Sequence, residues 1–360
     1  MHVTYRHDMT FQNQLMNSRK KSVPEFLSSR QRSPLWLSDQ SHATMRLMRY
    51  GHVAGIDRPV ARIVLGSTSF AQGRADLAKD LIETYLAAGG NIVDTAAIYG
   101  GGWSDRNIGE WLRTGGRRED ILILSKGAHH DSRGDRVSAT EISYDLGLSL
   151  ERMGTDHVDL YVLHRDDPNV HVSEVMNTLH HHHARGRIRA IGGSNWSIPR
   201  IEEANGYARQ HDLVQFSASS PNIALAVAKE PMWANCISIS GDEASKAWYG
   251  SHAMPLFSWS SQAGGFFSGR FRRDDHSNAD MVRVYYNDEN WARYDRAVTF
   301  GADLGLTPTQ VALAWVLNQP GLQTHALVGP ATVEELQSSL AVADLELSPE
   351  QVRWLSHGDL

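Results

Sequence analysis

Short apolar runs alternate with segments of helical periodicity through most of this chain. In residues 76–88, for example, apolar side chains recur every three or four positions, and the segment closes on Gly89-Gly90, a helix-stop signal. The runs that we predict to be strands cover residues 62–66, 92–93, 121–124, 158–163, 188–193, 213–217, 255–259 and 324–328. This alternation predicts an α/β domain built as a parallel eight-stranded (β/α)8 TIM barrel, with extra C-terminal helices.

The main alternative is a doubly wound open sheet. Such a sheet typically carries Gly-x-Gly-x-x-Gly after its first strand, because glycines let the backbone approach a pyrophosphate. No such motif follows residues 62–66, and Gly100-Gly101-Gly102 lacks the spacing. The sequence therefore favours the barrel.

Composition excludes several classes of protein. The 360 residues carry a formal net charge of −6, so no basic field attracts nucleic acid or an anionic membrane. No run approaches the ~20 apolar residues that a membrane span needs. The single cysteine, Cys236, cannot form an internal disulfide, which fits a reducing compartment. We therefore expect a cytoplasmic protein without nucleic-acid or membrane partners.

Residues 1–44 differ from the rest of the chain. They are rich in basic residues and serine and have no sustained periodicity. A transit peptide has a similar composition, but we favour a disordered extension or an upstream start codon, with Met45 as the natural beginning. Residues 45–360 are then expected to form a single barrel domain.

Four chemically reactive side chains stand at or just past the ends of successive predicted strands: Asp94, Tyr99, Lys126 and His164. Strand ends converge on one face of a parallel barrel, so these residues can meet there. An ammonium ~4 Å from a phenol, at an effective dielectric of ~20, stabilises the phenolate by about 4 kcal/mol. Lys126 is therefore expected to lower the pKa of Tyr99, while Asp94 keeps Lys126 charged and His164 polarises a carbonyl oxygen. None of the four can carry a hydride, so this chemistry needs a cofactor.

In this order, the four residues resemble the catalytic set of the aldo-keto reductases. The strand-two signature of that family is similar to the segment Ile92-Val93-Asp94-Thr95-Ala96-Ala97-Ile98-Tyr99-Gly100. The resemblance runs from about residue 62 to residue 345. It implies an oxidoreductase that reduces an aldehyde or ketone with NAD(P)H, with Tyr99 as the general acid. It also implies a small-molecule carbonyl substrate, for which the polar insertion 221–252 suggests a sugar-derived compound or a secondary metabolite.

The resemblance extends to contacts with the cofactor. It implies that Ser194, Asn195 and Gln215 hold the carboxamide and that the nicotinamide ring stacks on Trp259, since a flat aromatic side chain suits stacking. The other contacts that it implies are Ser67, Thr68, Ser260, Ser261, Gln262, Gly264, Gly329 and Thr332. Candidates for the walls of the substrate pocket are Trp103, His129, Trp196 and Trp233.

The adenosine end of the cofactor is less clear from sequence. Many members of the family bind a 2′-phosphate with basic residues after strand eight, but residues 328–339 contain neither Arg nor Lys. Arg270 matches a basic phosphate contact of some subfamilies, and a guanidinium suits a phosphate monoester. We therefore expect NADPH, with NADH as the alternative.

The same residues are compatible with other functions. Potassium-channel β subunits share the same four residues, so a regulatory cofactor-binding subunit is one alternative, and a non-redox lyase or isomerase on the same barrel is another. The run His180-His181-His182-His183 invites a metal interpretation, but consecutive residues splay around a helix, and no carboxylate or cysteine completes the set. We expect no metal there, only a solvated helix face. The oligomeric state is not predicted.

Overall fold

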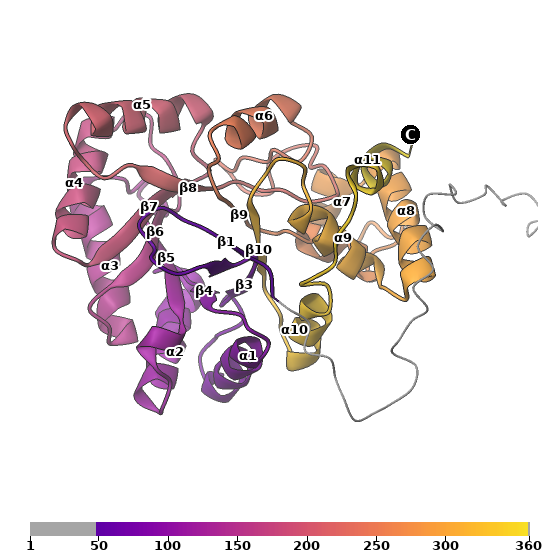
Figure 1. The fold of residues 1–360 in the computed structure, drawn as a ribbon, viewed down its shortest axis with the longest axis horizontal. Helices are drawn as coiled ribbons and strands as arrows, with labels where there is room; N and C mark the ends of the chain where they lie inside the picture. Colours follow the sequence, from indigo (N-terminus) through magenta and orange to yellow (C-terminus); the bar gives the residue numbers. More distant parts are fainter. Residues whose placement is uncertain (1–47, 359–360) are drawn as a thin grey trace, which may run out of the picture. The chain divides into compact units, whose positions relative to one another are not determined.

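The computed structural model describes residues 48–358, and the predicted extension 1–44 lies outside these residues. Parallel strands close into a barrel in the order β10-β3-β4-β5-β6-β7-β8-β9 (Figure 1). The barrel strands are β3 (Ile63–Gly66), β4 (Ile92–Asp94), β5 (Leu122–Gly127), β6 (Val158–Leu163), β7 (Ile188–Ser194), β8 (Phe216–Ser220), β9 (Leu256–Ser258) and β10 (Thr324–Val328). The predicted (β/α)8 barrel is thus confirmed.

Helices connect the strands and cover the barrel. They are α1 (Ala75–Ala87), α2 (Trp103–Arg113), α3 (Ala139–Met153), α4 (Val172–Ala184), α5 (Ile198–Gln210), α6 (Glu243–Ser251), α7 (Ala279–Tyr285), α8 (Asp288–Leu304), α9 (Pro308–Leu317), α10 (Val333–Leu340) and α11 (Pro349–His357). Local signals set several ends: Ser138 and Glu141 form a capping box on α3, and Gly154 ends that helix in the left-handed region with φ 65°. The helices α6 and α7 were not predicted.

A two-stranded antiparallel ribbon, β1 (Tyr50–Gly51) and β2 (Val60–Ala61), was also not predicted. It contacts the amino-terminal end of β10. The side chain of Gln323 exchanges hydrogen bonds with the backbone of His52, and the carbonyl of Ala61 pairs with Nδ1 of His325 at 2.9 Å. The ribbon therefore packs against the amino-terminal end of the barrel and leaves the opposite end available for a site.

The limits of strand β8 differ from the predicted range 213–217 by three residues. The strand begins at Phe216 and ends at Ser220, because its polar side chains find partners inside the barrel wall. Ser219 Oγ lies 3.0 Å from Tyr249 Oη, and Ser220 Oγ donates to the carbonyl of Phe257 at 2.6 Å. The apolar pair Leu213-Val214 instead lies before the strand and is only half-buried. Every residue of this segment is thus about three positions further from the strand's carboxyl end than the sequence indicated.

The histidine run on α4 contacts neighbouring elements. His182 is buried and lies 2.9 Å from Ser143 Oγ on α3, while His180 Nδ1 accepts a hydrogen bond from the N–H of Val214 at 3.2 Å. The prediction of a wholly solvated face was therefore wrong for His182. Within residues 48–358, no group of three or more His, Cys, Asp or Glu side chains could hold a metal ion, and no helix is long and apolar enough to cross a membrane.

Candidate active site

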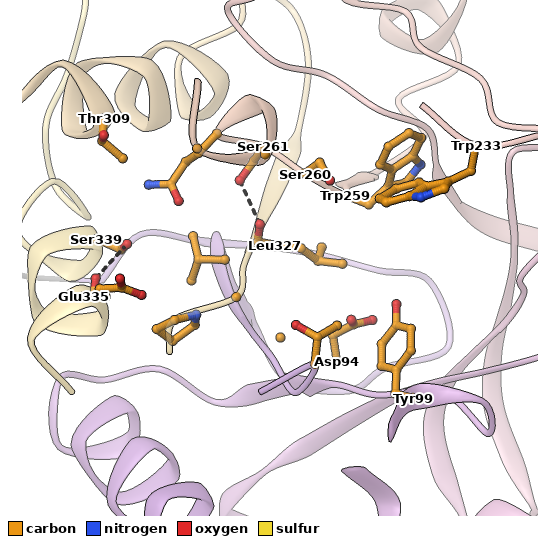
Figure 2. A pocket seen from close by; sticks show the side chains of 18 of the residues that line it. Asp94, Tyr99, Trp233, Trp259, Ser260, Ser261, Thr309, Leu327, Glu335 and Ser339 are labelled. Carbon is orange, nitrogen blue, oxygen red and sulfur yellow. Dashed lines mark hydrogen bonds between the residues drawn. The ribbon is translucent and has the colours of Figure 1, made fainter. Parts of the chain in front are cut away.

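A cavity of about 1080 Å³ opens at the carboxyl ends of the barrel strands. Figure 2 shows side chains that line it. Tyr99, Trp233 and Trp259 lie toward one end, and Thr309 and Glu335 lie toward the other. We call these the reacting end and the far end. The volume lies just above the range of ~300–1,000 Å³ that is typical of small-molecule and cofactor sites.

The four predicted catalytic residues come together at the reacting end. Asp94 is the last residue of β4, Lys126 lies near the end of β5, and His164 follows β6 directly. Tyr99 begins a short 3-10 helix after β4. Lys126 Nζ lies 3.1 Å from Tyr99 Oη, and it also donates to the carbonyl of Thr95 at 3.2 Å and forms a buried ion pair with Asp94. The phenol, the ammonium and the carboxylate thus form one continuous chain of contacts.

Burial and charge set the ionisation of this chain. Burial raises the pKa of Tyr99 above its ordinary value, and the adjacent Lys126 opposes that rise without cancelling it. Lys126 thus lowers the pKa of Tyr99 as expected, but burial outweighs this effect, because desolvation of the phenolate costs more than the ammonium returns. Burial lowers the pKa of Lys126, but the attraction of Asp94 and Tyr99 outweighs it, so the net direction is upward. At neutral pH the phenol is protonated and the ammonium is charged.

His164 faces the same end of the cavity as a neutral imidazole. Burial, reinforced by the charge of Lys126, holds the pKa of His164 well below its ordinary value. Its ring lies edge-on to that of Tyr99, with the centroids 5.7 Å apart, and its Nδ1 has no hydrogen-bond partner among the described residues. A neutral imidazole beside a protonated phenol can hydrogen-bond a carbonyl oxygen without adding a second charge.

Asn195 and Trp259 form the wall beside the reacting end. Asn195 Oδ1 accepts hydrogen bonds from Trp259 Nε1 at 3.1 Å and from the N–H of Ile237 at 3.0 Å. Ser194 Oγ donates to the carbonyl of Ser220 at 2.9 Å. The indole of Trp233 lies beside that of Trp259, with the centroids 5.7 Å apart. These contacts fix a flat aromatic and amide surface next to the catalytic residues.

The loop after β9 borders the middle of the cavity with its backbone. Gly264 and Gly265 have φ values of 62° and 86°, and Ala263 before them also lies in the left-handed region at 52°. The N–H groups of Ala263 and Gly265 already donate to the carbonyls of Ser260 and Gln262, at 2.8 Å and 3.0 Å, so these bonds hold the loop in its tight turn. A Cβ built on Gly265 would lie only 2.4 Å from Arg270 Nη2, so the guanidinium of Arg270 lies directly over this glycine. A pyrophosphate would meet a glycine backbone that allows close approach and a nearby cation here.

Comparison with known proteins decides the family. Residues 62–357 match the aldo/keto reductase family. The chain belongs to this family. As a member, it is an NAD(P)H-dependent oxidoreductase.

Individual relatives agree with this assignment. The uncharacterized oxidoreductase YrpG of Bacillus subtilis is 25% identical over 324 residues, which cover 86% of this chain and 95% of that protein. The aryl-alcohol dehydrogenase [NADP(+)] of Phanerodontia chrysosporium is 25% identical over 303 residues, covering 77% of this chain and 74% of that protein. The crystal structure of a thermostable aldo-keto reductase in complex with the inhibitor epalrestat superposes with a TM-score of 0.68 at 20% identity, covering 86% of this chain and 99% of that one. This last likeness shows the fold alone.

In this aldo-keto reductase, most of the predicted site residues line the cavity. Besides the four catalytic candidates, those on the lining are Thr68, Ser194, Asn195, Trp259, Ser260, Ser261, Gln262, Gly264, Arg270 and Gly329. Of the predicted pocket walls, His129 and Trp233 lie on it, whereas Trp103 and Trp196 do not. Residues from at least six loops are thus brought to one surface.

Three predicted cofactor contacts lie elsewhere. Gln215 is exposed just before β8, where Arg209 Nη1 donates to its Oε1 at 3.4 Å, so the prediction that it holds the carboxamide is wrong. Gln215 lies there because β8 begins at Phe216, three residues later than predicted. Thr332 caps α10 by accepting a hydrogen bond from the N–H of Glu335 at 3.3 Å, outside the cavity lining. Ser67 is fully buried between strands, where its carbonyl accepts from Ser104 Oγ at 2.7 Å.

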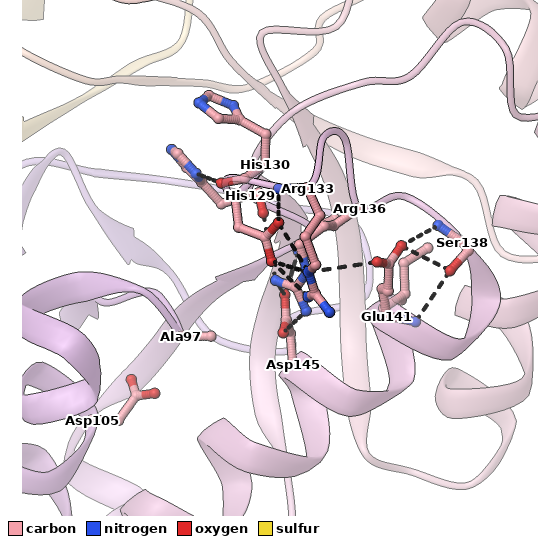
Figure 3. A network of polar contacts seen from close by, with 12 residues as sticks. Ala97, Asp105, His129, His130, Arg133, Arg136, Ser138, Glu141 and Asp145 are labelled. Atoms are coloured by element: carbon pink, nitrogen blue, oxygen red, sulfur yellow. Dashed lines mark hydrogen bonds and ion pairs between the residues drawn. The ribbon is translucent and has the colours of Figure 1, made fainter.

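An ionic network positions the wall formed by the loop after β5. Asp145 of α3 accepts hydrogen bonds from the N–H of Ala128 at 2.9 Å and from Arg136 Nη2 at 2.8 Å (Figure 3). Arg136 also lies 3.7 Å from Glu141. These contacts hold His129 on the cavity lining, where its ring meets that of His164 with the centroids 4.7 Å apart.

Some residues on the cavity lining were not predicted from the sequence. Arg165 and Thr309 both line the cavity, and neither was singled out. Arg165 directly follows His164 at the end of β6, and this adjacency was a usable signal. Thr309 lies in the first turn of α9, and no pattern in the sequence brings that helix to the cavity.

Proposed function

We propose that the protein reduces an aldehyde or ketone to the alcohol, with Tyr99 as the general acid. The observation that carries this proposal is the contact of 3.1 Å between Tyr99 Oη and Lys126 Nζ at the reacting end of the cavity. When bound, the nicotinamide cofactor supplies the hydride, which none of these side chains can provide.

The residues of the chain then have defined roles in this proposal. The protonated phenol of Tyr99 donates its proton to the carbonyl oxygen as negative charge develops there, a contribution of typically ~10²–10⁴-fold. Lys126 stabilises the phenolate that remains, and Asp94 keeps Lys126 charged and oriented. Neutral His164 orients the carbonyl oxygen by hydrogen bonding. In the reverse direction, the Tyr99 phenolate accepts the proton of the alcohol.

We further propose NADPH as the cofactor. Ser194, Asn195 and Trp259 would hold and stack the nicotinamide, the glycine-rich loop after β9 would surround the pyrophosphate, and Arg270 would bind the 2′-phosphate. The guanidinium of Arg270 lies on the cavity lining and contacts Ser268 Oγ through Nε at 3.1 Å, with no carboxylate partner among the described residues. The NADP(+) in the name of the relative from Phanerodontia chrysosporium supports the same choice.

One observation favours NADH as the second candidate. Glu335 lies on the lining at the far end, where its Oε2 accepts a hydrogen bond from the N–H of Ala331 at 2.8 Å. A carboxylate can bind the ribose 2′-hydroxyl of NADH and repels a 2′-phosphate. Titration of NADPH and NADH against the wild-type protein and Arg270→Met separates the two. We expect wild type to bind NADPH more tightly, and we expect Arg270→Met to lose about tenfold for NADPH alone.

For the substrate we propose an aromatic carbonyl compound. Trp233 and Trp259 present a paired aromatic surface at the reacting end, and the name aryl-alcohol dehydrogenase of one relative indicates aromatic alcohols for that protein. The earlier expectation of a sugar-derived compound or a secondary metabolite stays a prediction.

The proposed reaction is tested by the turnover of a panel of aromatic aldehydes, ketones and keto-sugars with NADPH. The same panel is run with Tyr99→Phe, which keeps the ring and removes only the proton donor. We expect turnover by the wild type and a loss of kcat of about 10³-fold in the variant. Unchanged turnover in Tyr99→Phe would contradict the proposed mechanism. Cofactor binding without reduction of any carbonyl would favour the regulatory alternative.

A further inference from the structure

A buried arginine on the cavity lining lacks a charged partner among the described residues. Arg165 directly follows His164 and is only 4% exposed. Its Nη1 donates to the carbonyl of His164 at 2.7 Å, but its Nε has no hydrogen-bond partner, and no carboxylate pairs with it anywhere in the chain from residue 48 to residue 358. Buried arginines are almost always paired with an anion, because an isolated charge pays a large desolvation penalty.

The acidic residue nearest to Arg165 in the sequence does not form an ion pair with it. Asp166 pairs with Arg200 at 3.2 Å, and Arg200 also pairs with Glu203 at 2.9 Å. The chain therefore contains a buried arginine that is fully satisfied close to one that is not. None of the described carboxylates pairs with Arg165, and an anionic group on a ligand would supply the missing charge.

The position of Arg165 is fixed at the reacting end. Trp196 Nε1 donates to the carbonyl of Arg165 at 3.2 Å, which anchors its backbone. Burial is the main influence on the pKa of Tyr99 and of His164, but the charge of Arg165 contributes to both. Its Nη1 lies 2.7 Å from the backbone carbonyl of His164, and both residues line the cavity, so the guanidinium lies beside one of the catalytic residues.

Two exposed apolar side chains line the same cavity as Arg165. Trp233 and Ile98 line the cavity and are 55% and 46% exposed, respectively. A ligand that fits both surfaces has an anionic group close to its carbonyl and an apolar or aromatic body that covers these two side chains.

We propose that Arg165 binds a carboxylate on the substrate, so that the preferred substrates are 2-oxo acids with an apolar or aromatic body. The planar guanidinium presents donors in a fork that matches a carboxylate. This inference rests on the proposed reaction at Tyr99, and it adds a specificity-determining residue to that site.

The first test compares phenylglyoxylate, a 2-oxo acid, with its neutral methyl ester in NADPH-dependent reduction. We expect wild type to prefer the acid in kcat/KM and Arg165→Met to lower the acid-to-ester ratio by about 10-fold to 100-fold, mainly through KM. Arg165→Lys keeps the charge but loses the fork, so its ratio should be intermediate. Arg189→Met is the matched control: it removes one positive charge, Arg189 is half-exposed, and it pairs with Asp159 away from the cavity. It should keep the wild-type ratio.

The second test does not need turnover. Benzoate and benzamide are titrated calorimetrically into the NADP+-loaded protein and into loaded Arg165→Met. We expect benzoate to bind wild type more tightly than benzamide and to lose this advantage in the variant.

The outcomes separate the two proposals. If the ester is reduced but the acid is not preferred, and benzoate binds no better than benzamide, the role of Arg165 is overturned while the reductase function stands. If no carbonyl compound is reduced but benzoate binding depends on Arg165, the anion site is supported and the proposed reaction fails. Equal losses for acid and ester in Arg165→Met and Arg165→Lys would indicate a purely structural arginine and overturn the inference.

Discussion

The two ends of the barrel bury charged and polar side chains in different ways. At the amino-terminal end, Asp159 of β6 accepts hydrogen bonds from Arg118 Nη2 at 2.7 Å and from the N–H of Ile123 at 2.9 Å. His325 of β10 is equally buried, and both of its ring nitrogens have partners, the carbonyl of Ala61 and the side chain of Gln323. At the carboxyl end, His164 Nδ1 and Arg165 Nε have none among the described residues.

This difference teaches that burial alone does not identify a functional polar residue. A saturated buried group holds elements together, since removing it leaves its partners uncompensated. A buried group with open hydrogen-bonding capacity costs stability unless a ligand supplies the missing partner. The buried polar groups at the amino-terminal end therefore stabilise the fold, and those at the carboxyl end indicate a binding site.

Lys126→Met should have the largest effect, because Lys126 both stabilises the fold and takes part in the proposed reaction. It leaves Asp94 buried without its cation, so the free energy of unfolding should fall by about 3–5 kcal/mol. It also removes the charge that stabilises the Tyr99 phenolate, so kcat should fall by about 10²–10⁴-fold. Since Lys126 lowers the pKa of Tyr99, the pH profile of alcohol oxidation should move to higher pH. Denaturant titration and steady-state kinetics measure these effects. Exposed Lys79→Met should change neither, and an unshifted oxidation profile would argue against the coupling of Lys126 to Tyr99.

Asp159→Asn should affect stability alone. The substitution weakens the pairing of a buried carboxylate with Arg118 and Arg189, so the free energy of unfolding should fall by about 3 kcal/mol. The kcat of the folded variant should match wild type, because Asp159 lies at the opposite end of the barrel. Asp156→Asn, at an exposed neighbouring carboxylate, is the control for denaturation. A large loss of kcat in the folded Asp159→Asn protein would break the division between the two ends.

His325→Gln tests the amino-terminal end through pH. Burial lowers the pKa of His325 to about 3. Its unfolded-state pKa is ~6.5, so below that pH the unfolded chain binds a proton that the folded protein does not. Wild type should therefore lose up to about 1.4 kcal/mol per pH unit from this group as pH falls from ~6.5 toward the folded pKa. The variant should lack this component of the slope, which denaturation at several pH values measures. Equal slopes in both proteins would contradict the assignment, and His211→Gln at an exposed position should behave as wild type.

Gln215→Ala should have the smallest effect. The side chain is exposed at the amino-terminal end and makes one long hydrogen bond, so stability should change by less than about 0.5 kcal/mol. The dissociation constant for NADPH should match wild type, measured by the same titration as for Arg270→Met. A marked loss of cofactor affinity in Gln215→Ala would restore its predicted contact with the carboxamide.

The sequence by itself determined the barrel and the four residues at its reacting end. Alternating apolar runs and helical periods predict the (β/α)8 topology because each pattern has its own period, and the limits of β6 and β10 agree with the prediction to the residue. Asp94, Tyr99, Lys126 and His164 were found because parallel strands all bring their carboxyl ends to one face.

Only the tertiary structure decided the register of β8, the ionisation of Tyr99 and the isolation of Arg165. The serines of β8 are buried because Tyr249 Oη and the carbonyl of Phe257, distant in sequence, supply their partners. The pKa of Tyr99 depends on the balance between desolvation and the charge of Lys126, and desolvation is a property of the packed surroundings. Whether a buried arginine is satisfied depends likewise on where every carboxylate of the fold lies, which no local pattern of residues records.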